Sequence, residues 1–183
     1  MSIIRFEAKL FKIGSASNAA AAWTLLVLPK MASAKLPSRA LTMVKGTING
    51  FSFQAALEPD GKGSHWFRID KTILEATNAA AGDTVSLAIE PSRDWLEPEM
   101  STDLKIALEG TPQAHAVWMD ITPNARWDWI RWIRATKQPE TRKRRIEIAC
   151  SKLKKGERRP CCFNRNLCSE PYVSKNWVLL EPS

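Results

Sequence analysis

The hydrophobic pattern of this chain changes its period near residue 90, and this change is the feature that most constrains the fold. Before it, apolar and polar residues alternate, as at Ile4, Phe6, Ala8 and Leu10, which predicts half-buried strands. After the proline-bounded segment 91–98, apolar residues recur every three or four positions, which predicts helices. A chain of 183 residues is long enough for one ordinary domain or two small ones. The change of period favours two.

The first part is expected to be a small closed β-barrel. Asn49-Gly50 lies between two alternating runs and predicts a type I′ hairpin, because both central residues of that turn need positive φ. Asp70 is expected to cap one short helix that Gly82 ends. About six strands with one helix favour a closed barrel, because closure leaves no open edge. The expected strands are Ile4–Leu10, Trp23–Leu28, Thr42–Ile48, Phe51–Leu57, His65–Ile69 and Val85–Ile89.

The second part is expected to be all helical. Thr122-Pro123 predicts a cap followed by proline at the first helical position, which opens a helix over 124–137. A final helix is expected over 141–155, and Gly156 stops it. The tail is expected to be mostly irregular and docked by its apolar residues 177–180. The prediction is therefore an α+β chain with a barrel domain at 1–93, a helical module at 99–159 and a Cys-containing tail at 160–183.

Positive charge is concentrated in one segment. The chain carries 27 basic and 19 acidic side chains, a net charge of +8. Residues 1–96 hold 11 basic and 8 acidic side chains, whereas residues 123–168 hold 14 basic and 4 acidic ones, a net charge of +10. With 44% hydrophobic and 25% charged residues the composition is that of a globular protein, which excludes wholesale disorder. The excess points to a negatively charged partner for the last helices.

The residues expected to contact an acidic partner lie on the final helix and its exit. The same electrostatics suit an acidic protein, a nucleic acid or a phosphate-bearing envelope component, and a merely solvated helix face is the simplest alternative. Trp129 and Trp132 are expected in the core, whereas Trp127 projects elsewhere and is added as a candidate contact. The candidate contact residues are Arg142, Lys143, Arg144, Arg145, Lys152, Lys154, Lys155, Arg158, Arg159 and Trp127.

Catalytic and cofactor motifs are missing from the sequence. It contains no H-E-x-x-H, G-x-S-x-G, Walker A or G-x-G-x-x-G pattern, so no catalytic residue, cofactor or metal is assigned, and a non-enzymatic role is favoured. The four cysteines, Cys150, Cys161, Cys162 and Cys168, lack the paired spacing of structural zinc sites; inert packing or a redox-labile thiol is the better expectation. A small-molecule site or an unrecognised enzyme at the barrel mouth, near His65 and Trp66, remains a third alternative.

A cytoplasmic location is expected. The longest apolar run, Ala19–Leu28, is ten residues long, well short of the ~20 that span a bilayer as a helix. Ala32-Ser33-Ala34 imitates a signal-peptide cleavage site, but Pro29-Lys30 interrupts the approach to it and an alternating strand precedes it. The cysteines are too few and too clustered for a disulfide scaffold. The oligomeric state is not readable from the sequence.

Two segments resemble known bacterial families. Residues 44–50, 60–65 and 81–85 resemble a small bacterial barrel domain of unknown function. Residues 104–159, with the pieces 127–137, 141–146 and 153–156, resemble the YdeI/OmpD-associated family, also called bacteriocin-protection proteins. The resemblance implies a bacterial protein linked to envelope stress or antimicrobial-peptide tolerance, and it supplies no catalytic or ligand residues.

Overall fold

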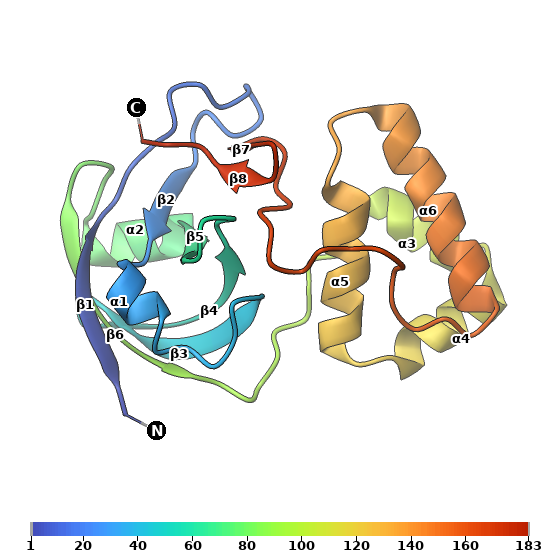
Figure 1. The fold of residues 1–183 in the computed structure, drawn as a ribbon, viewed down its shortest axis with the longest axis horizontal. Coiled ribbons are helices and arrows are strands. Elements are labelled where there is room, and N and C mark those ends of the chain that lie inside the picture. Colours follow the sequence, from blue (N-terminus) through green and yellow to red (C-terminus); the bar gives the residue numbers. More distant parts are fainter. Residues whose placement is uncertain (1, 183) are drawn as a thin grey trace. The chain divides into compact units, whose positions relative to one another are not determined.

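The computed structural model describes residues 2–182, which form two compact units. We call them the sheet unit, composed of Met1–Asp94, Arg165–Cys168 and Tyr172–Ser183, and the helical unit, composed of Trp95–Asn164 and Ser169–Pro171. The chain is thus α+β, with strands before helices, as predicted (Figure 1).

The sheet unit is built on one six-stranded antiparallel sheet. Its strand order is β1-β6-β3-β4-β5-β2, so every pair except β3–β4 and β4–β5 joins strands that are distant in sequence. The Asn49-Gly50 turn links β3 to β4 with φ values of 46° and 82°, which confirms the predicted hairpin. The strands are β1 (Ile4–Lys9), β2 (Thr24–Val27), β3 (Thr42–Ile48), β4 (Phe51–Pro59), β5 (His65–Ile69) and β6 (Thr84–Pro91).

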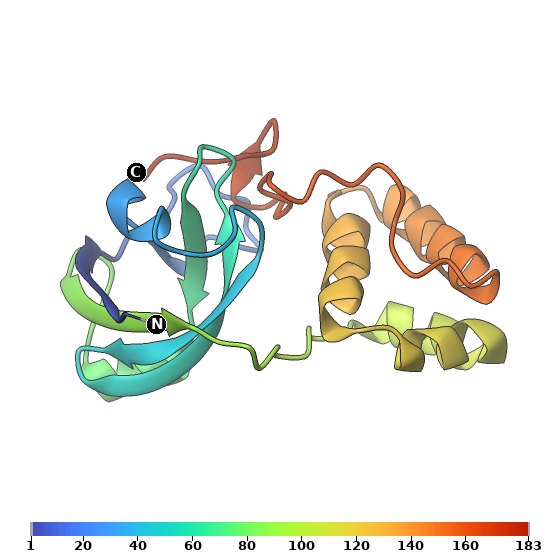
Figure 2. The same ribbon diagram turned by 60° about the horizontal axis from the view of Figure 1, so that its bottom comes forward.

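The sheet is curled but open, so the prediction of a closed barrel was wrong. Figures 1 and 2 show the strands wrapping around a common interior. The edge strands β1 and β2 are joined only by the isolated bridge between Phe11 and Leu25. Closure fails because β2 is only four residues long and Pro29 follows it closely, so β1 has no ladder partner on its outer side.

The curled sheet surrounds a hydrophobic core. The alternation along β1 is confirmed at Ile4 and Leu10, which are buried, while Phe6 and Ala8 are partly buried and pack against the same cluster. Gly46 lies where β3 crosses β6 so closely that a Cβ atom would meet the carbonyl oxygen of Ala88, and only glycine fits there.

Two short helices accompany the sheet. Helix α1 (Lys30–Ser33) was not predicted; four residues leave no periodic pattern to detect. Helix α2 (Lys71–Thr77) begins at the predicted cap, where the Asp70 carboxylate accepts a hydrogen bond from the backbone N–H of Ile73 at 2.9 Å. It ends at Asn78, whose φ of 52° supplies the left-handed cap expected from Gly82.

The C-terminal tail returns to the sheet unit. It is irregular except for a small hairpin of β7 (Ser174–Lys175) and β8 (Val178–Leu179), whose turn residues Asn176 and Trp177 have φ values of 53° and 65°. Leu179 is buried with Val173 and Cys168 in a cluster that contains Trp66 of β5. The apolar tail residues therefore complete a second core of the sheet unit.

The helical unit contains α3 (Thr102–Glu109), α4 (Pro112–Asp120), α5 (Pro123–Arg134) and α6 (Pro139–Lys154). Three of them begin with proline at the first turn, where its missing N–H costs nothing. Thr122 caps α5 as predicted, accepting from the Ala125 N–H at 3.2 Å. The predicted apolar faces of the last two helices are buried. Their core residues include Ala125, Trp129, Ile133, Ile146, Ala149 and Leu153.

The two tryptophans assigned to the core are confirmed. Trp129 is buried and lies edge-on against the partly buried Trp132, with ring centroids 6.0 Å apart at 76°. Among the helices described, none combines the length and the apolar character needed to cross a bilayer.

Candidate functional site

The helical unit uses five of the nine candidate basic residues in its own structure. Arg142 of α6 shows this most clearly, because its guanidinium donates to both oxygens of Asp103, at 2.7 and 3.0 Å, and to the Ser101 hydroxyl at 2.7 Å. The hydrogen bonds from Arg142 hold the pKa of Asp103 well below its usual range. Arg142 therefore fastens α6 to the start of α3.

Arg145 lies about one turn further along α6 and is held by α5. Its guanidinium donates to the backbone oxygen of Trp132 at 2.7 Å and lies 5.4 Å from the centroid of the Trp132 ring. Burial lowers the pKa of Arg145, as it does for any cation withdrawn from water. Arg145 thus joins α6 to the end of α5.

The residues at the exit of α6 are paired as well. Lys152 contacts Glu157 at 3.3 Å, within the same segment. Arg158 donates to the carboxylate and the backbone oxygen of Asp120, both at 3.0 Å, and so ties the exit to the end of α4. Arg159 forms an ion pair with the buried carboxylate of Asp128 on α5. These contacts position the segment that follows α6, so the charges of Lys152, Arg158 and Arg159 are already paired within the unit.

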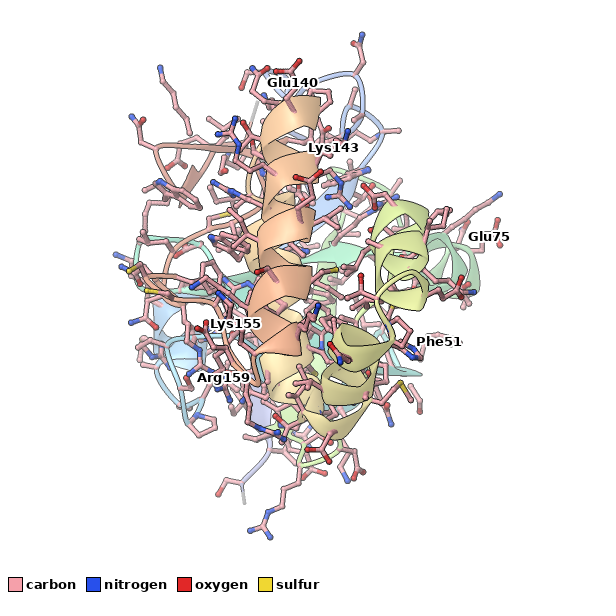
Figure 3. All side chains as sticks on the ribbon, turned by 90° about the vertical axis from the view of Figure 1, so that its right-hand side faces the viewer. Phe51, Glu75, Glu140, Lys143, Lys155 and Arg159 are labelled. Atoms are coloured by element: carbon pink, nitrogen blue, oxygen red, sulfur yellow. The ribbon has the colours of Figure 1, made fainter. Side chains whose placement is uncertain are left out.

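Four candidate cations remain exposed: Lys143, Arg144, Lys154 and Lys155, which we call the α6 surface. Their side chains make no ion pair or hydrogen bond within residues 2–182. At 100° per residue, Lys143 and Lys154 differ by about 20° around the helix, and they are about 16 Å apart along it. Arg144 and Lys155 repeat this relation. Figure 3 looks onto α6 and shows Lys143 near the end marked by Glu140 and Lys155 near the other end.

The α6 surface is only moderately basic. The exposed carboxylates of Glu140 and Glu147 lie on the same side of the helix. Around the helix axis they fall between the Lys143 and Lys154 pair and the Arg144 and Lys155 pair. The helical unit holds 14 basic and 10 acidic side chains, a net charge of +4, and the rest of the chain also carries +4. The +10 of the sequence segment falls to +4 because acidic residues of α3, α4 and the preceding loop, together with Glu170 of the tail, fold into the same unit.

Trp127 lies in a different place from the α6 surface. Its indole N–H donates to the backbone oxygen of Leu96 at 2.7 Å, and the side chain is half-buried. It borders a cavity of about 370 Å³ that also contains Arg142 and Arg134. The sequence gave no sign of this cavity, because its walls come from three helices and the loop before α3. The lining residues are Glu99, Ser101, Leu104, Trp127, Ile130, Ile133, Arg134 and Arg142.

His65 has a structural environment in the sheet unit. Its Nδ1 lies 2.6 Å from the Ser33 hydroxyl and its Nε2 lies 2.9 Å from the backbone oxygen of Ala40. Burial lowers the pKa of His65. Both His65 and Trp66 are buried, so neither offers a side chain to a ligand at the mouth of the sheet, where the third alternative placed them.

The cysteines divide into two classes. Cys150 and Cys168 are buried, and burial raises the pKa of Cys150. Cys161 and Cys162 are exposed, with their sulfur atoms 2.9 Å apart. Within residues 2–182 no three His, Cys, Asp or Glu side chains are grouped as metal ligands.

Comparison with protein families assigns both units. The model of the bacteriocin-protection, YdeI or OmpD-associated family matches residues 97–156, which cover α3 to α6. The model of a domain of unknown function, DUF1905, matches residues 6–89, which cover most of the curled sheet. Among curated proteins no significant match was found. The chain therefore carries a DUF1905 domain followed by a domain of the YdeI/OmpD-associated, bacteriocin-protection family, in the order that the sequence resemblance predicted.

Proposed function

We propose that this is a non-enzymatic bacterial accessory protein for tolerance of antimicrobial peptides, and that its helical unit contacts an acidic partner through the α6 surface. The match to the bacteriocin-protection family supports the physiological role. The observation that carries the contact is the set of four exposed, unpaired cations on α6. A cytoplasmic location belongs to the same proposal.

Unpaired cations suit such a contact better than the paired ones do. An acidic partner that recruited Arg142 or Arg158 would first have to break existing bonds to Asp103 or Asp120, which offsets the gain. Lys143 and Lys154 have no such cost. Because they are about 16 Å apart, they fit carboxylates or phosphates spread over an extended surface rather than one small anion.

The test compares two variants with the same change in charge. The α6 variant replaces Lys143, Arg144, Lys154 and Lys155 with Gln. The control variant replaces four exposed, unpaired cations of the sheet unit with Gln: Lys9, Lys30, Lys35 and Arg93. Each variant removes four positive charges, and surface changes of this kind alter stability by about 0.5 kcal/mol or less per site.

Survival in a cationic antimicrobial peptide is the measurement, made in cells whose only copy of the protein is the wild type or a variant. We expect the α6 variant to lower tolerance to the level of cells without the protein, and the control variant to retain wild-type tolerance. A folded α6 variant with full tolerance would contradict the proposal. Loss with both variants would show that total charge, not the α6 surface, is what matters.

Nucleic-acid binding through the same surface is the alternative that this proposal displaces. Glu140 and Glu147 lie among the four cations, and the candidate stacking residue Trp127 is half-buried away from them. Four phosphate contacts would give a log–log salt slope of about −3.6, or roughly a 150-fold loss of affinity between 50 and 200 mM salt. Binding of duplex or single-stranded oligonucleotides with that slope, lost in the α6 variant, would favour the alternative; no binding at low salt excludes it.

The cavity of about 370 Å³ supports a second candidate function, binding of a small molecule with an apolar body. Trp127 and Ile130 offer apolar walls, while Arg142 at the border is already bonded to Asp103. A thermal-shift screen with small aromatic and aliphatic molecules tests this function, with Ile130→Trp as the variant that fills the cavity. A shift seen in the wild type and lost in the variant supports it, and no shift with any of these molecules counts against it.

A further inference from the structure

The neighbouring residues Cys161 and Cys162 form an exposed pair of thiols in the helical unit. Their sulfur atoms are 2.9 Å apart, closer than an ordinary contact between unbonded sulfur atoms. The other two cysteines of the chain, Cys150 and Cys168, are buried. The pair is therefore the part of the chain's thiol chemistry that a soluble oxidant reaches first.

The segment that carries the pair is fixed on both sides. Before it, Arg159 forms an ion pair with Asp128, and the backbone oxygen of Arg158 accepts from the Trp129 indole N–H at 3.1 Å. After it, the ring of Phe163 lies 5.2 Å from the guanidinium carbon of Arg131. Anchors at both ends hold the two sulfur atoms together, which gives each an effective concentration far above that of a free thiol.

The backbone at Cys162 is itself unusual. Its φ of 61° lies in the left-handed region, which residues other than Gly, Asn and Asp rarely adopt. Three of the other four non-glycine residues with positive φ within residues 2–182 are asparagines. The strained backbone at Cys162 thus lies within the anchored segment, at the point where the two sulfur atoms are in contact.

We propose that Cys161 and Cys162 are a reversible redox site, oxidised by a hydroperoxide to a disulfide between adjacent residues. The thiolate of one cysteine attacks a peroxide oxygen and the O–O bond breaks. That cysteine becomes a sulfenic acid, and the alkoxide or hydroxide leaves as alcohol or water with the proton that the thiol had released. The sulfur of the other cysteine then attacks the sulfenic sulfur, the S–O bond breaks, and the hydroxide leaves as water with the proton of the second thiol. Two thiols thus give two electrons to one peroxide.

The hydrogen bond between the two thiols raises the pKa of Cys162. Because either sulfur can be the donor, either cysteine can be oxidised first, and the other cysteine then acts as the resolving thiol.

Strain makes the site reversible. Adjacent Cα atoms across a trans peptide are about 3.8 Å apart, less than the roughly 4.4–6.8 Å of ordinary disulfides. A disulfide closed over that distance is strained and easily reduced, so the thiols of a reducing compartment restore it. Such a bond is regulatory rather than structural, which suits the cytoplasmic location proposed above.

Mass spectrometry of the full-length protein tests the proposal. Hydrogen peroxide is added to reduced protein, remaining thiols are alkylated, and trypsin releases the peptide 159–165, which contains Cys161 and Cys162 but neither buried cysteine. We expect a loss of about 2 Da in this peptide, reversed by dithiothreitol, and oxidation of the pair about tenfold or more faster than that of Cys150. In Cys162→Ser we expect a sulfenic acid at Cys161 that dimedone traps; Cys150→Ser is the matched control and should behave as the wild type.

Three results would overturn the proposal. They are addition of two or three oxygen atoms at either cysteine without the 2 Da loss, disulfide-linked dimers in place of the internal bond, and no faster oxidation than at Cys150. This readout does not depend on peptide tolerance, so the proposal of a redox site and the proposal of the α6 surface are tested independently.

Discussion

Replacing Arg142 with Ala should destabilise the helical unit, whereas replacing its neighbour Lys143 should not. Arg142 makes three charge-assisted hydrogen bonds that join α6 to Asp103 and Ser101, and its side chain is 27% exposed. Exposed ion pairs contribute about 0–1 kcal/mol, and hydrogen bonds to charged groups about 1.5–3 kcal/mol. For this half-buried set we expect Arg142→Ala to lower the free energy of unfolding by about 2 kcal/mol. Lys143→Ala, at an exposed and unpaired site, should change it by less than about 0.5 kcal/mol.

Urea and thermal unfolding followed by far-UV circular dichroism measure the difference. For a unit of this size 2 kcal/mol corresponds to a fall in Tm of roughly 8–16 °C. Arg142→Lys should recover less than half of the loss, because an ammonium group does not bridge both oxygens of Asp103 and the Ser101 hydroxyl in the same fixed geometry. Equal stability of Arg142→Ala and Lys143→Ala would refute the division of the basic residues into paired and free ones.

The same pair makes a prediction for pH. The pKa of Asp103 is depressed in the folded state because Arg142 donates hydrogen bonds to its carboxylate. The pairing therefore stabilises the fold above the ordinary carboxyl pKa of about 3.9, and its contribution is lost as pH falls through the depressed value. The stability gap between wild type and Arg142→Ala should accordingly be constant from pH 5 to 7 and shrink in acid; a gap that stays constant in acid would show that the carboxylate is not what Arg142 contributes.

Two further predictions concern the sheet unit. Burial lowers the pKa of His65 below its unfolded value of about 6.5, so stability should fall as pH drops below 6.5, and His65→Gln should remove that dependence in acid titrations followed by near-UV circular dichroism. At Gly61 φ is 81° and a Cβ atom would collide with the Trp177 carbonyl oxygen, whereas at Gly63 φ is 95° and the surrounding space is open. Gly63→Ala should lower the free energy of unfolding by about 1–2 kcal/mol through backbone strain. Gly61→Ala should lower it further and speed amide exchange in the tail hairpin; equal losses for the two variants would contradict the packing of the tail on this loop.

Local signals predicted much of the secondary structure. The Asn49-Gly50 turn, the Asp70 cap and the Thr122-Pro123 start depend on residues within a few positions of one another, and each is confirmed. Barrel closure depends instead on how far two edge strands extend toward each other. No local pattern reports that β2 stops after four residues.

The candidate site shows the same division. The sequence located the basic residues and assigned Trp129 and Trp132 to the core, but it could not separate paired from free cations. Arg142 pairs with Asp103, which lies 39 positions earlier in the chain, and Arg158 pairs with Asp120, which lies 38 positions earlier. These pairs form because α3 and α4 fold back against α6. The net charge of +10 counted along the segment was for this reason a poor guide to the charge of the folded unit.

The most direct test of the α6 surface is the salt dependence of binding to heparin, a soluble polyanion, by the wild type, the α6 variant and the control variant. Each lysine or arginine that contacts an anionic polymer contributes about one to the log–log slope. We predict that the α6 variant loses roughly three to four from the slope, and that the control variant, with the same net charge, keeps the wild-type slope. Equal slopes for the two variants would contradict the claim that the four free cations of α6 form the contact surface.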